Sequence, residues 1–161
     1  MDITATKQKL YEYLKKNNKT ITFAESCTGG LIASSFCEVS GVSTVFKGSI
    51  VSYSDEVKIN NLNVSKETIK AHTAVSNQTA EEMARNAAHI FNADYAISVT
   101  GYAGPDGGTD MDPVGTFYLG FYIDGKTGVI REYHPGLSRN DLRNKALECA
   151  FIRITEMIKC E

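Results

Sequence analysis

The spacing of hydrophobic and polar residues predicts helices in several parts of the chain. Ile3, Leu10 and Leu14 recur at roughly helical spacing with lysines between them, so we expect an amphipathic helix from about residue 3 to residue 17. Serine is a common N-cap residue, and three serines precede segments of helical composition. Further helices are therefore predicted after Ser54, Ser65 and Ser76, over Leu31–Phe36, and from about Asn140 to Lys159.

Short segments rich in β-branched and aromatic residues predict the strands. They are Thr20–Ala24, a segment that ends near Tyr53, Asp94–Gly101, a segment from Val114 and a segment from Gly128. The last two flank the turn sequence DGKTG and are expected to pair as a hairpin. Helices that alternate with strands, together with this hairpin, predict an α/β fold: a three-layer α/β/α sandwich on a mixed sheet, in one domain of residues 1–161.

Charge and apolar content narrow the classes of partner. The formal net charge of −2 gives no support for nucleic-acid binding. No apolar stretch approaches the ~20 residues of a membrane span, and the N-terminus lacks the apolar segment of a signal peptide. We therefore expect a cytoplasmic protein with neither a nucleic acid nor a membrane as its partner.

Cysteines and histidines indicate neither a disulfide framework nor a metal site. No CxxC pair occurs, and no histidine stands at a helical ligand spacing from another histidine or a cysteine. The sequence therefore predicts reduced thiols and no bound metal. The residues concerned are Cys27, Cys37, Cys149 and Cys160, with His72, His89 and His134.

The segment ESCTGG directly follows the first predicted strand and precedes the Leu31–Phe36 helix. Ser26 is therefore expected on a strand-to-helix turn, where backbone N–H groups point at whatever lies above the new helix. Gly29 and Gly30 let a ligand approach this backbone without a Cβ in the way. The turn suits a nucleophile or an anion, although Ser26 or Thr28 could instead simply cap the helix.

Two more candidate segments follow later strands, and ligands bind at the carboxyl ends of strands in open α/β sheets. SYSDEVK supplies Tyr53 and Lys58, and a serine nucleophile needs a base such as Lys58 or Glu25. A lysine base must be neutral, which burial favours, whereas Lys58 could also be an ordinary surface charge. TGYAGPDGG could hold an anion with its N–H groups or be a plain surface loop, and its glycines are Gly101, Gly104, Gly107 and Gly108.

Several motifs, taken in order, resemble the CinA C-terminal domain family, the nicotinamide mononucleotide deamidases. They are AESCTGGLIA, GSIVSYSDEVK, HTAVS, DYAISVTGYAGPDGGT and PVGTFYLGF, and together they span almost the whole chain. The resemblance implies the α/β/α sandwich with a five-stranded mixed sheet. It also implies an amidohydrolase of pyridine nucleotide salvage, which converts nicotinamide mononucleotide to nicotinate mononucleotide and ammonia without a metal or organic cofactor.

The catalytic roles of the family fall on matching residues of this sequence. The resemblance implies that Ser26 is the nucleophile and Lys58 the general base, with Tyr53 and Ser43 assisting around the base. Where the family usually has a lysine directly before PVGT, this chain has Asp112.

The resemblance also assigns residues to substrate binding. N–H groups around Thr28 to Gly30 could hold the oxyanion, and the glycine loop is expected to anchor the 5′-phosphate together with an arginine. Arg143 matches the family's arginine best, and Arg139 is a close rival. The expected substrate-binding residues are Thr28, Gly29, Gly30, Thr100, Gly101, Gly104, Gly107, Gly108 and Arg143.

Two other functions remain open from the sequence. Cys27 could be the nucleophile, because a thiol at a helix N-terminus has a lowered pKa. Alternatively, the chain could be a non-catalytic mononucleotide-binding or regulatory module. The oligomeric state is also open, since the helix from Asn140 to Lys159 could pair with a second copy.

Overall fold

The computed structural model describes residues 2–158 and contains helices and strands in alternation. Ser54, Ser65 and Ser76 cap the helices predicted to follow them, as the side chain of each accepts a hydrogen bond from the first helical turn. In chain order the elements are α1 (Ile3–Lys16), β1 (Ile21–Glu25), α2 (Leu31–Phe36), a 3₁₀ turn η1 (Val42–Thr44), β2 (Phe46–Val51), α3 (Asp55–Leu62), α4 (Lys66–His72), α5 (Asn77–Phe91), β3 (Tyr95–Gly101), β4 (Thr116–Ile123), β5 (Lys126–Tyr133) and α6 (Arg139–Met157).

The five strands form one mixed sheet in the order β2-β1-β3-β4-β5. β1 pairs in parallel with both β2 and β3, whereas β4 is antiparallel to β3 and to β5. The hairpin turn is shorter than the sequence suggested, because Ile123 already pairs with Lys126. The predicted α/β class and mixed sheet are confirmed, and the carboxyl ends of β1, β2 and β3 meet at one edge.

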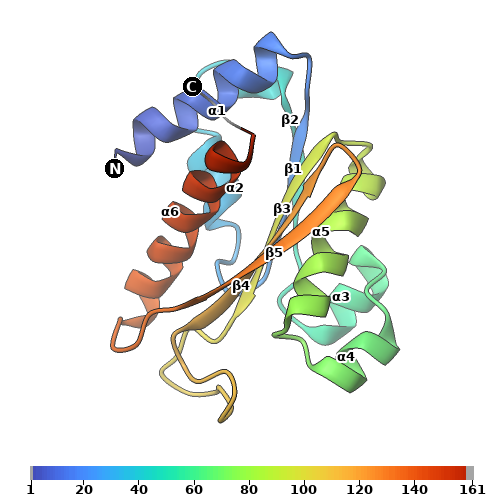
Figure 1. Ribbon diagram of the computed structural model, residues 1–161, viewed down its shortest axis with the longest axis vertical. Coiled ribbons are helices and arrows are strands. Elements are labelled where there is room, and N and C mark those ends of the chain that lie inside the picture. The colour runs from blue at the N-terminus through green and yellow to red at the C-terminus, as the bar shows by residue number, and fades with distance from the viewer. Residues whose placement is uncertain (1, 159–161) are drawn as a thin grey trace.

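Helices cover both faces of the sheet, which gives the three predicted layers. Figure 1 shows α1, α2 and α6 on one face, and α3, α4 and α5 on the other. β1 is buried along its whole length, as expected for a central strand between two helical layers. The yellow to orange loop between β3 and β4 extends beyond the edge where the carboxyl ends of β1, β2 and β3 lie (Figure 1).

Aromatic packing fixes the short helix α2 on the sheet. Phe36 of α2 contacts Phe23 of β1 edge-on, with ring centroids 5.7 Å apart, and lies 5.7 Å from the ring of Phe151 in α6. A helix of six residues is too short to be stable alone, so this packing stabilises it. Lys7 of α1 adds hydrogen bonds from its buried Nζ to the carbonyl and hydroxyl oxygens of Ser35 near the end of α2.

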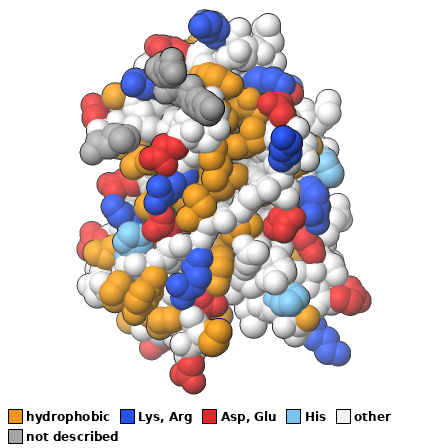
Figure 2. All heavy atoms as spheres, viewed as in Figure 1, with side chains coloured by type: hydrophobic (Ala, Val, Ile, Leu, Met, Phe, Trp, Pro, Cys, Tyr) orange, Lys and Arg blue, Asp and Glu red, His pale blue; other side chains and the backbone are white. Residues whose placement is uncertain are grey.

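None of the helices in the described residues is long and apolar enough to cross a membrane. Figure 2 shows hydrophobic side chains along the middle of the face seen in Figure 1, with charged side chains on both sides. Cys27, Cys37 and Cys149 are free thiols, as predicted. Cys160, like the predicted helix end at Lys159, lies outside the described residues.

Candidate active site

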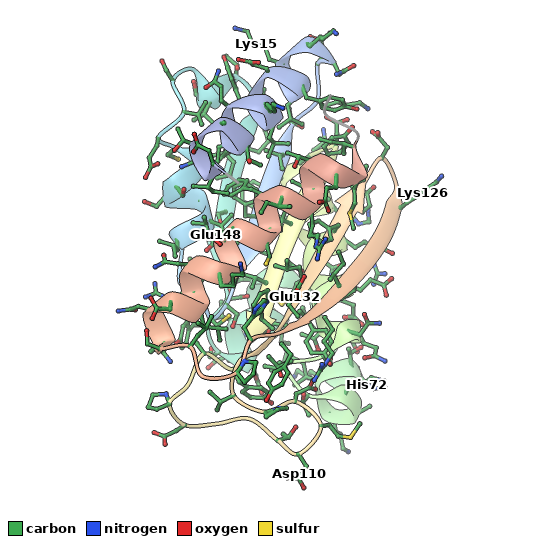
Figure 3. The ribbon with its side chains drawn as sticks, turned by 60° about the vertical axis from the view of Figure 1, so that its left-hand side comes forward. Lys15, His72, Asp110, Lys126, Glu132 and Glu148 are labelled. Atoms are coloured by element: carbon green, nitrogen blue, oxygen red, sulfur yellow. The ribbon has the colours of Figure 1, made fainter. Side chains whose placement is uncertain are left out.

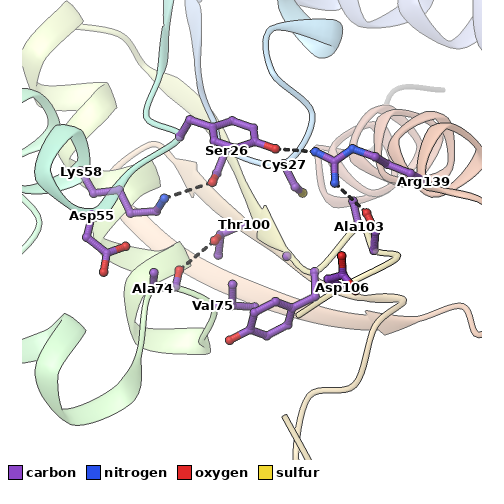
Figure 4. A pocket seen from close by; sticks show the side chains of 14 residues that line it. Ser26, Cys27, Asp55, Lys58, Ala74, Val75, Thr100, Ala103, Asp106 and Arg139 are labelled. Atoms are coloured by element: carbon purple, nitrogen blue, oxygen red, sulfur yellow. Dashed lines mark hydrogen bonds between the residues drawn. The ribbon is translucent and has the colours of Figure 1, made fainter. Parts of the chain in front are cut away.

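Ser26 lies directly after β1, at the edge where parallel strands end. Its backbone N–H donates to the carbonyl oxygen of Val99 in β3 at 3.0 Å. On the other side, the N–H of Ser52 donates to the carbonyl oxygen of Glu25 at 2.7 Å. Both neighbouring strands therefore hold the backbone around Ser26, and its side chain points into the pocket shown in Figure 4.

Lys58 reaches Ser26 from α3, the helix that follows β2. The Lys58 Nζ donates to Ser26 Oγ at 3.0 Å and to the carbonyl oxygen of Ser52 at 2.7 Å (Figure 4). The Lys58 residue is only 1% exposed, so the alternative of an ordinary surface charge is wrong. The two side chains meet because each follows a strand, and these two parallel strands are neighbours in the sheet.

The amine of Lys58 has a perturbed proton affinity. Burial lowers its pKa below the ordinary lysine value, because the charged form loses hydration. The nearby Asp55 and Cys27 favour the charged form, but their effect is smaller than that of burial. The neutral amine, which can accept a proton, is thus more accessible for Lys58 than for a lysine in water.

Glu25 is buried beneath the turn and organises it. Its carboxylate accepts hydrogen bonds from the Thr28 hydroxyl at 2.7 Å and from the N–H groups of Gly30, Ile32 and Ala33 at 3.0, 3.0 and 2.8 Å. Glu25 therefore satisfies the first N–H groups of α2. The alternative that Ser26 or Thr28 caps this helix is wrong, and Glu25 is a structural acceptor that does not point into the pocket.

The backbone N–H groups of the turn differ in their availability. Gly29 donates to the carbonyl oxygen of Ser26 at 3.0 Å, and Gly30 donates to Glu25. These two amides are therefore engaged and are not free to bind an oxyanion, contrary to the expectation from the sequence. Within the part of the chain that the structure describes, the amides of Cys27 and Thr28 donate to no other residue.

The pocket beside Ser26 and Lys58 has a cavity volume of about 190 Å³ and is open to solvent. Half of its charged lining is basic, from Lys58 and Arg139, and half is acidic, from Asp55 and Asp106. Of the predicted residues, it brings together Ser26, Tyr53, Lys58, Thr100, Gly101 and Gly104. It does not include Ser43, Thr28, Gly29, Gly30, Gly107, Gly108 or Arg143.

Ser43 is far from the predicted base. It lies in η1, which precedes β2, whereas the pocket forms where β2 ends. A strand is extended, so the segments before and after it lie at its opposite ends. Ser43 precedes β2 and Lys58 follows it, so the two residues lie at opposite ends of this strand. The expectation that Ser43 assists around Lys58 within this chain is corrected accordingly.

Arg139, the rival of Arg143, is the arginine that lines the pocket. Its guanidinium donates to the hydroxyl of Tyr53 and, at 2.7 Å, to the carbonyl oxygen of Gly104. Figure 4 shows Arg139 and Lys58 approaching from opposite sides. Arg143 lies one helical turn further along α6 and donates to the carbonyl oxygen of Thr28 at 2.9 Å, so it braces the turn instead.

Cys27 lines the pocket, but its thiol is a poor nucleophile there. The residue is buried, and burial raises its pKa to about 11, although the charge of Lys58 opposes this shift. Little thiolate is present at neutral pH when the pKa is that high. The lowered pKa expected for Cys27 at a helix N-terminus is therefore wrong.

Sequence reasoning missed the wall of the pocket formed by Ala74 and Val75. The hydroxyl of Thr100 donates to the carbonyl oxygen of Ala74 at 2.7 Å, which ties this segment to the end of β3. Both residues directly precede Ser76, the N-cap of α5. The available signal was the motif HTAVS, which contains both residues and belongs to the family resemblance.

Asp112 is engaged with the sheet and does not line the pocket. Its carboxylate accepts hydrogen bonds from the Tyr118 hydroxyl and from Arg131 Nε, both at 2.9 Å. Its carbonyl oxygen also accepts from the N–H of Thr109 at 2.8 Å, which closes the glycine-rich loop on itself. Asp112, which stands where the family usually has a lysine, thus anchors the end of this loop to β4 and β5.

Comparison with models of protein families identifies the family of this chain. The sequence model of the CinA C-terminal domain matches residues 3–158. The chain belongs to the CinA C-terminal domain family. A CinA-like protein of Fervidobacterium nodosum is 57% identical over 94% of this chain, and one of Petrotoga mobilis is 41% identical over 93%. This chain spans 37% of the length of each of these two relatives.

Solved structures of CinA-family proteins have the same fold. A competence damage-inducible protein A from Klebsiella pneumoniae matches with a TM-score of 0.92 and 33% identity, over 96% of each chain. A competence/damage inducible protein CihA from Agrobacterium tumefaciens matches with a TM-score of 0.92 and 32% identity, over 97% of this chain and 95% of that one. The five-stranded mixed sheet implied by the family resemblance is therefore confirmed.

In this CinA-family domain, Glu25→Gln is expected to destabilise the turn that carries Ser26. Whichever way the new amide is oriented, its NH₂ group faces an N–H donor of α2, since both carboxylate oxygens accept from the backbone. We expect a loss of about 1–3 kcal/mol in the free energy of unfolding, measured by urea denaturation. The control is Glu12→Gln, an exposed residue of α1, which should change little. Equal losses in both variants would contradict the role of Glu25.

Proposed function

We propose that this CinA-family domain is an amidohydrolase that converts nicotinamide mononucleotide to nicotinate mononucleotide and ammonia. The observation that carries the proposal is the 3.0 Å hydrogen bond between Lys58 Nζ and Ser26 Oγ, both of which line an open pocket. A hydroxyl next to an amine whose pKa is lowered by burial is the arrangement of an activated serine nucleophile. The family resemblance supplies the substrate.

In the first step, Ser26 Oγ attacks the carbon of the carboxamide while Lys58 Nζ accepts the hydroxyl proton. A C–O bond forms, and the carbonyl π electrons move to oxygen, which becomes the oxyanion. The amide of Cys27, which lines the pocket and donates to no other residue within the described chain, is the candidate donor to that oxygen. An oxyanion-hole donor contributes about 3 kcal/mol to the stability of the transition state in enzymes where it was removed.

In the second step, the C–N bond breaks and Lys58 returns its proton to the departing nitrogen, which leaves as ammonia. An acyl ester remains on Ser26. Water then attacks this ester, with Lys58 again accepting a proton, and nicotinate mononucleotide leaves as Ser26 regains its hydroxyl. Lys58 thus serves as base and acid in turn, which the position of its Nζ beside Ser26 Oγ permits.

Arg139 is proposed to bind the 5′-phosphate of the substrate. Its guanidinium is held by the oxygens of Tyr53 and Gly104, and it forms no ion pair with a carboxylate in the described part of the chain. A pocket arginine without an acidic partner suits a phosphate, which it binds with charge-assisted hydrogen bonds. This replaces Arg143 in the role that the sequence suggested. The glycine-rich loop stays a proposed second anchor through Gly101 and Gly104, whereas Gly107 and Gly108 lie outside the pocket lining.

Ammonia release from nicotinamide mononucleotide tests the proposed nucleophile and base. Ser26→Ala and Lys58→Met are each expected to lower kcat at least about a thousandfold, because each removes one half of the proton-transfer pair. Cys27→Ala is the control from the same pocket and should keep most of the activity. Loss of activity in Cys27→Ala with retention in Ser26→Ala would contradict the proposal in favour of a thiol nucleophile.

The same assay separates the enzyme from a non-catalytic module. If the wild-type domain binds the mononucleotide, seen as a higher melting temperature, but releases no ammonia, the amidohydrolase is wrong. The absence of a nucleic-acid partner and of a cofactor, and a cytoplasmic location, stay predictions, and the oligomeric state stays open.

A comparison of two substrates tests the role of Arg139. Arg139→Gln is expected to raise KM for nicotinamide mononucleotide about ten- to hundredfold, because a charge-assisted hydrogen bond to phosphate is lost. KM for nicotinamide riboside, which has no phosphate, should be the same in Arg139→Gln and in the wild type. An equal rise in KM for both substrates would show that Arg139 does not act on the phosphate.

A further inference from the structure

A group of three potential metal ligands lies between β5 and α6. Their ligand atoms, from Glu132, His134 and Cys149, all lie within 4.8 Å of one another. Glu132 lies in β5, and His134 is the first residue after this strand. Their side chains point to the same face, because side chains alternate along a strand and the two residues are two positions apart. Figure 3 shows Glu132 between β5 and α6. Cys149 comes from the facing side of α6.

The arrangement has features of a built site. Cys149 is 9% exposed, and its thiol forms no hydrogen bond within residues 2–158. The ring of His134 stacks on Phe117, with centroids 5.6 Å apart and planes 12° apart, which fixes the orientation of the imidazole. One oxygen of Glu132 accepts from Arg153 at 3.0 Å, and the other faces His134 Nε2 at 3.2 Å. Two of the three potential ligands, Glu132 and His134, are therefore already in direct contact.

We propose that Glu132, His134 and Cys149 form a zinc site, with a water molecule as the fourth ligand. Thiolate, imidazole and carboxylate are the ligand types that zinc prefers. Bond lengths of about 2.0–2.3 Å set the ligand atoms of a tetrahedral ion roughly 3.5 Å apart, so the group closes by about 1 Å through side-chain rotation. Arg153 then acts as the outer partner that orients the carboxylate.

Zinc binding at this site releases a proton and changes no oxidation state. The thiol of Cys149 gives up its proton to solvent, and neutral His134 binds through Nε2 with its proton on Nδ1. The ion replaces the direct contact between His134 Nε2 and Glu132 Oε2, so the thiol proton of Cys149 is the one proton released. No sequence pattern indicated this site, because His134 follows a strand, Cys149 lies in a helix, and the two residues have no motif spacing.

The site lies close to the proposed catalytic machinery in the chain. Residues 135–138 connect His134 to α6, whose first residue is Arg139. A zinc ion bound to His134 and Cys149 links the end of β5 to α6, the two elements that this connection joins. It therefore stabilises the segment from which Arg139 enters the pocket.

Competition for zinc chloride against a chromophoric chelator tests the site, on protein freed of any affinity tag. The wild type is expected to take one equivalent of zinc, and Cys149→Ser and His134→Ala should each weaken binding at least tenfold. Cys37→Ser, which removes an exposed thiol elsewhere, is the matched control and should bind as the wild type does. Uptake by the wild type no greater than by the Cys149→Ser/His134→Ala double variant overturns the site.

Cobalt(II) provides a second measurement that needs no core substitution. Coordination by Cys149 gives a thiolate-to-cobalt charge-transfer band in the near ultraviolet, which Glu132→Gln weakens and Cys37→Ser leaves unchanged. A cobalt spectrum without this band contradicts ligation by Cys149. Ammonia release plays no part in either measurement, so the result is independent of the proposed amidohydrolase activity.

Discussion

Burial of the Lys58 amine is the constraint on which the site depends. The residue is 1% exposed, and its Nζ has two oxygen partners, the hydroxyl of Ser26 and the carbonyl of Ser52, with no carboxylate among its hydrogen-bond partners in the described chain. Because burial disfavours the ammonium, the neutral amine that can accept the Ser26 proton becomes accessible. The turn below is fixed separately, by the carboxylate of Glu25. Proton transfer and backbone position thus rely on different buried groups.

Much of the fold could be predicted because its signals are local. Serine caps and helical periodicity indicated α3, α4 and α5, and continuous apolar segments indicated the buried strands β1 and β3. Long-range packing could not be predicted in this way. Lys7 resembled any surface lysine in its helix, yet it is 3% exposed, because α2 ends beside it. Such contacts depend on where two distant helices meet, which periodicity does not determine.

The same difference explains the candidate site. Ser26 and Lys58 follow neighbouring parallel strands, so the topology itself brings them together. Arg139 and Arg143 are one turn apart on one helix, and only the packing of α6 decides that Arg139 reaches the pocket while Arg143 reaches Thr28. Ser43 was placed by motif similarity alone, and motif similarity did not reveal which end of β2 it would occupy.

Titration of the Lys58 amine in the free protein tests most directly whether Lys58 can act as the base for Ser26. NMR of protein labelled with ¹⁵N-lysine can follow this nitrogen, with Lys58→Met used to assign its signal. We expect a pKa clearly below the ordinary value of about 10.4, because burial outweighs the charge of Asp55. A pKa at or above the ordinary value would mean that Lys58 stays charged at neutral pH, and it would contradict its role as the base for Ser26.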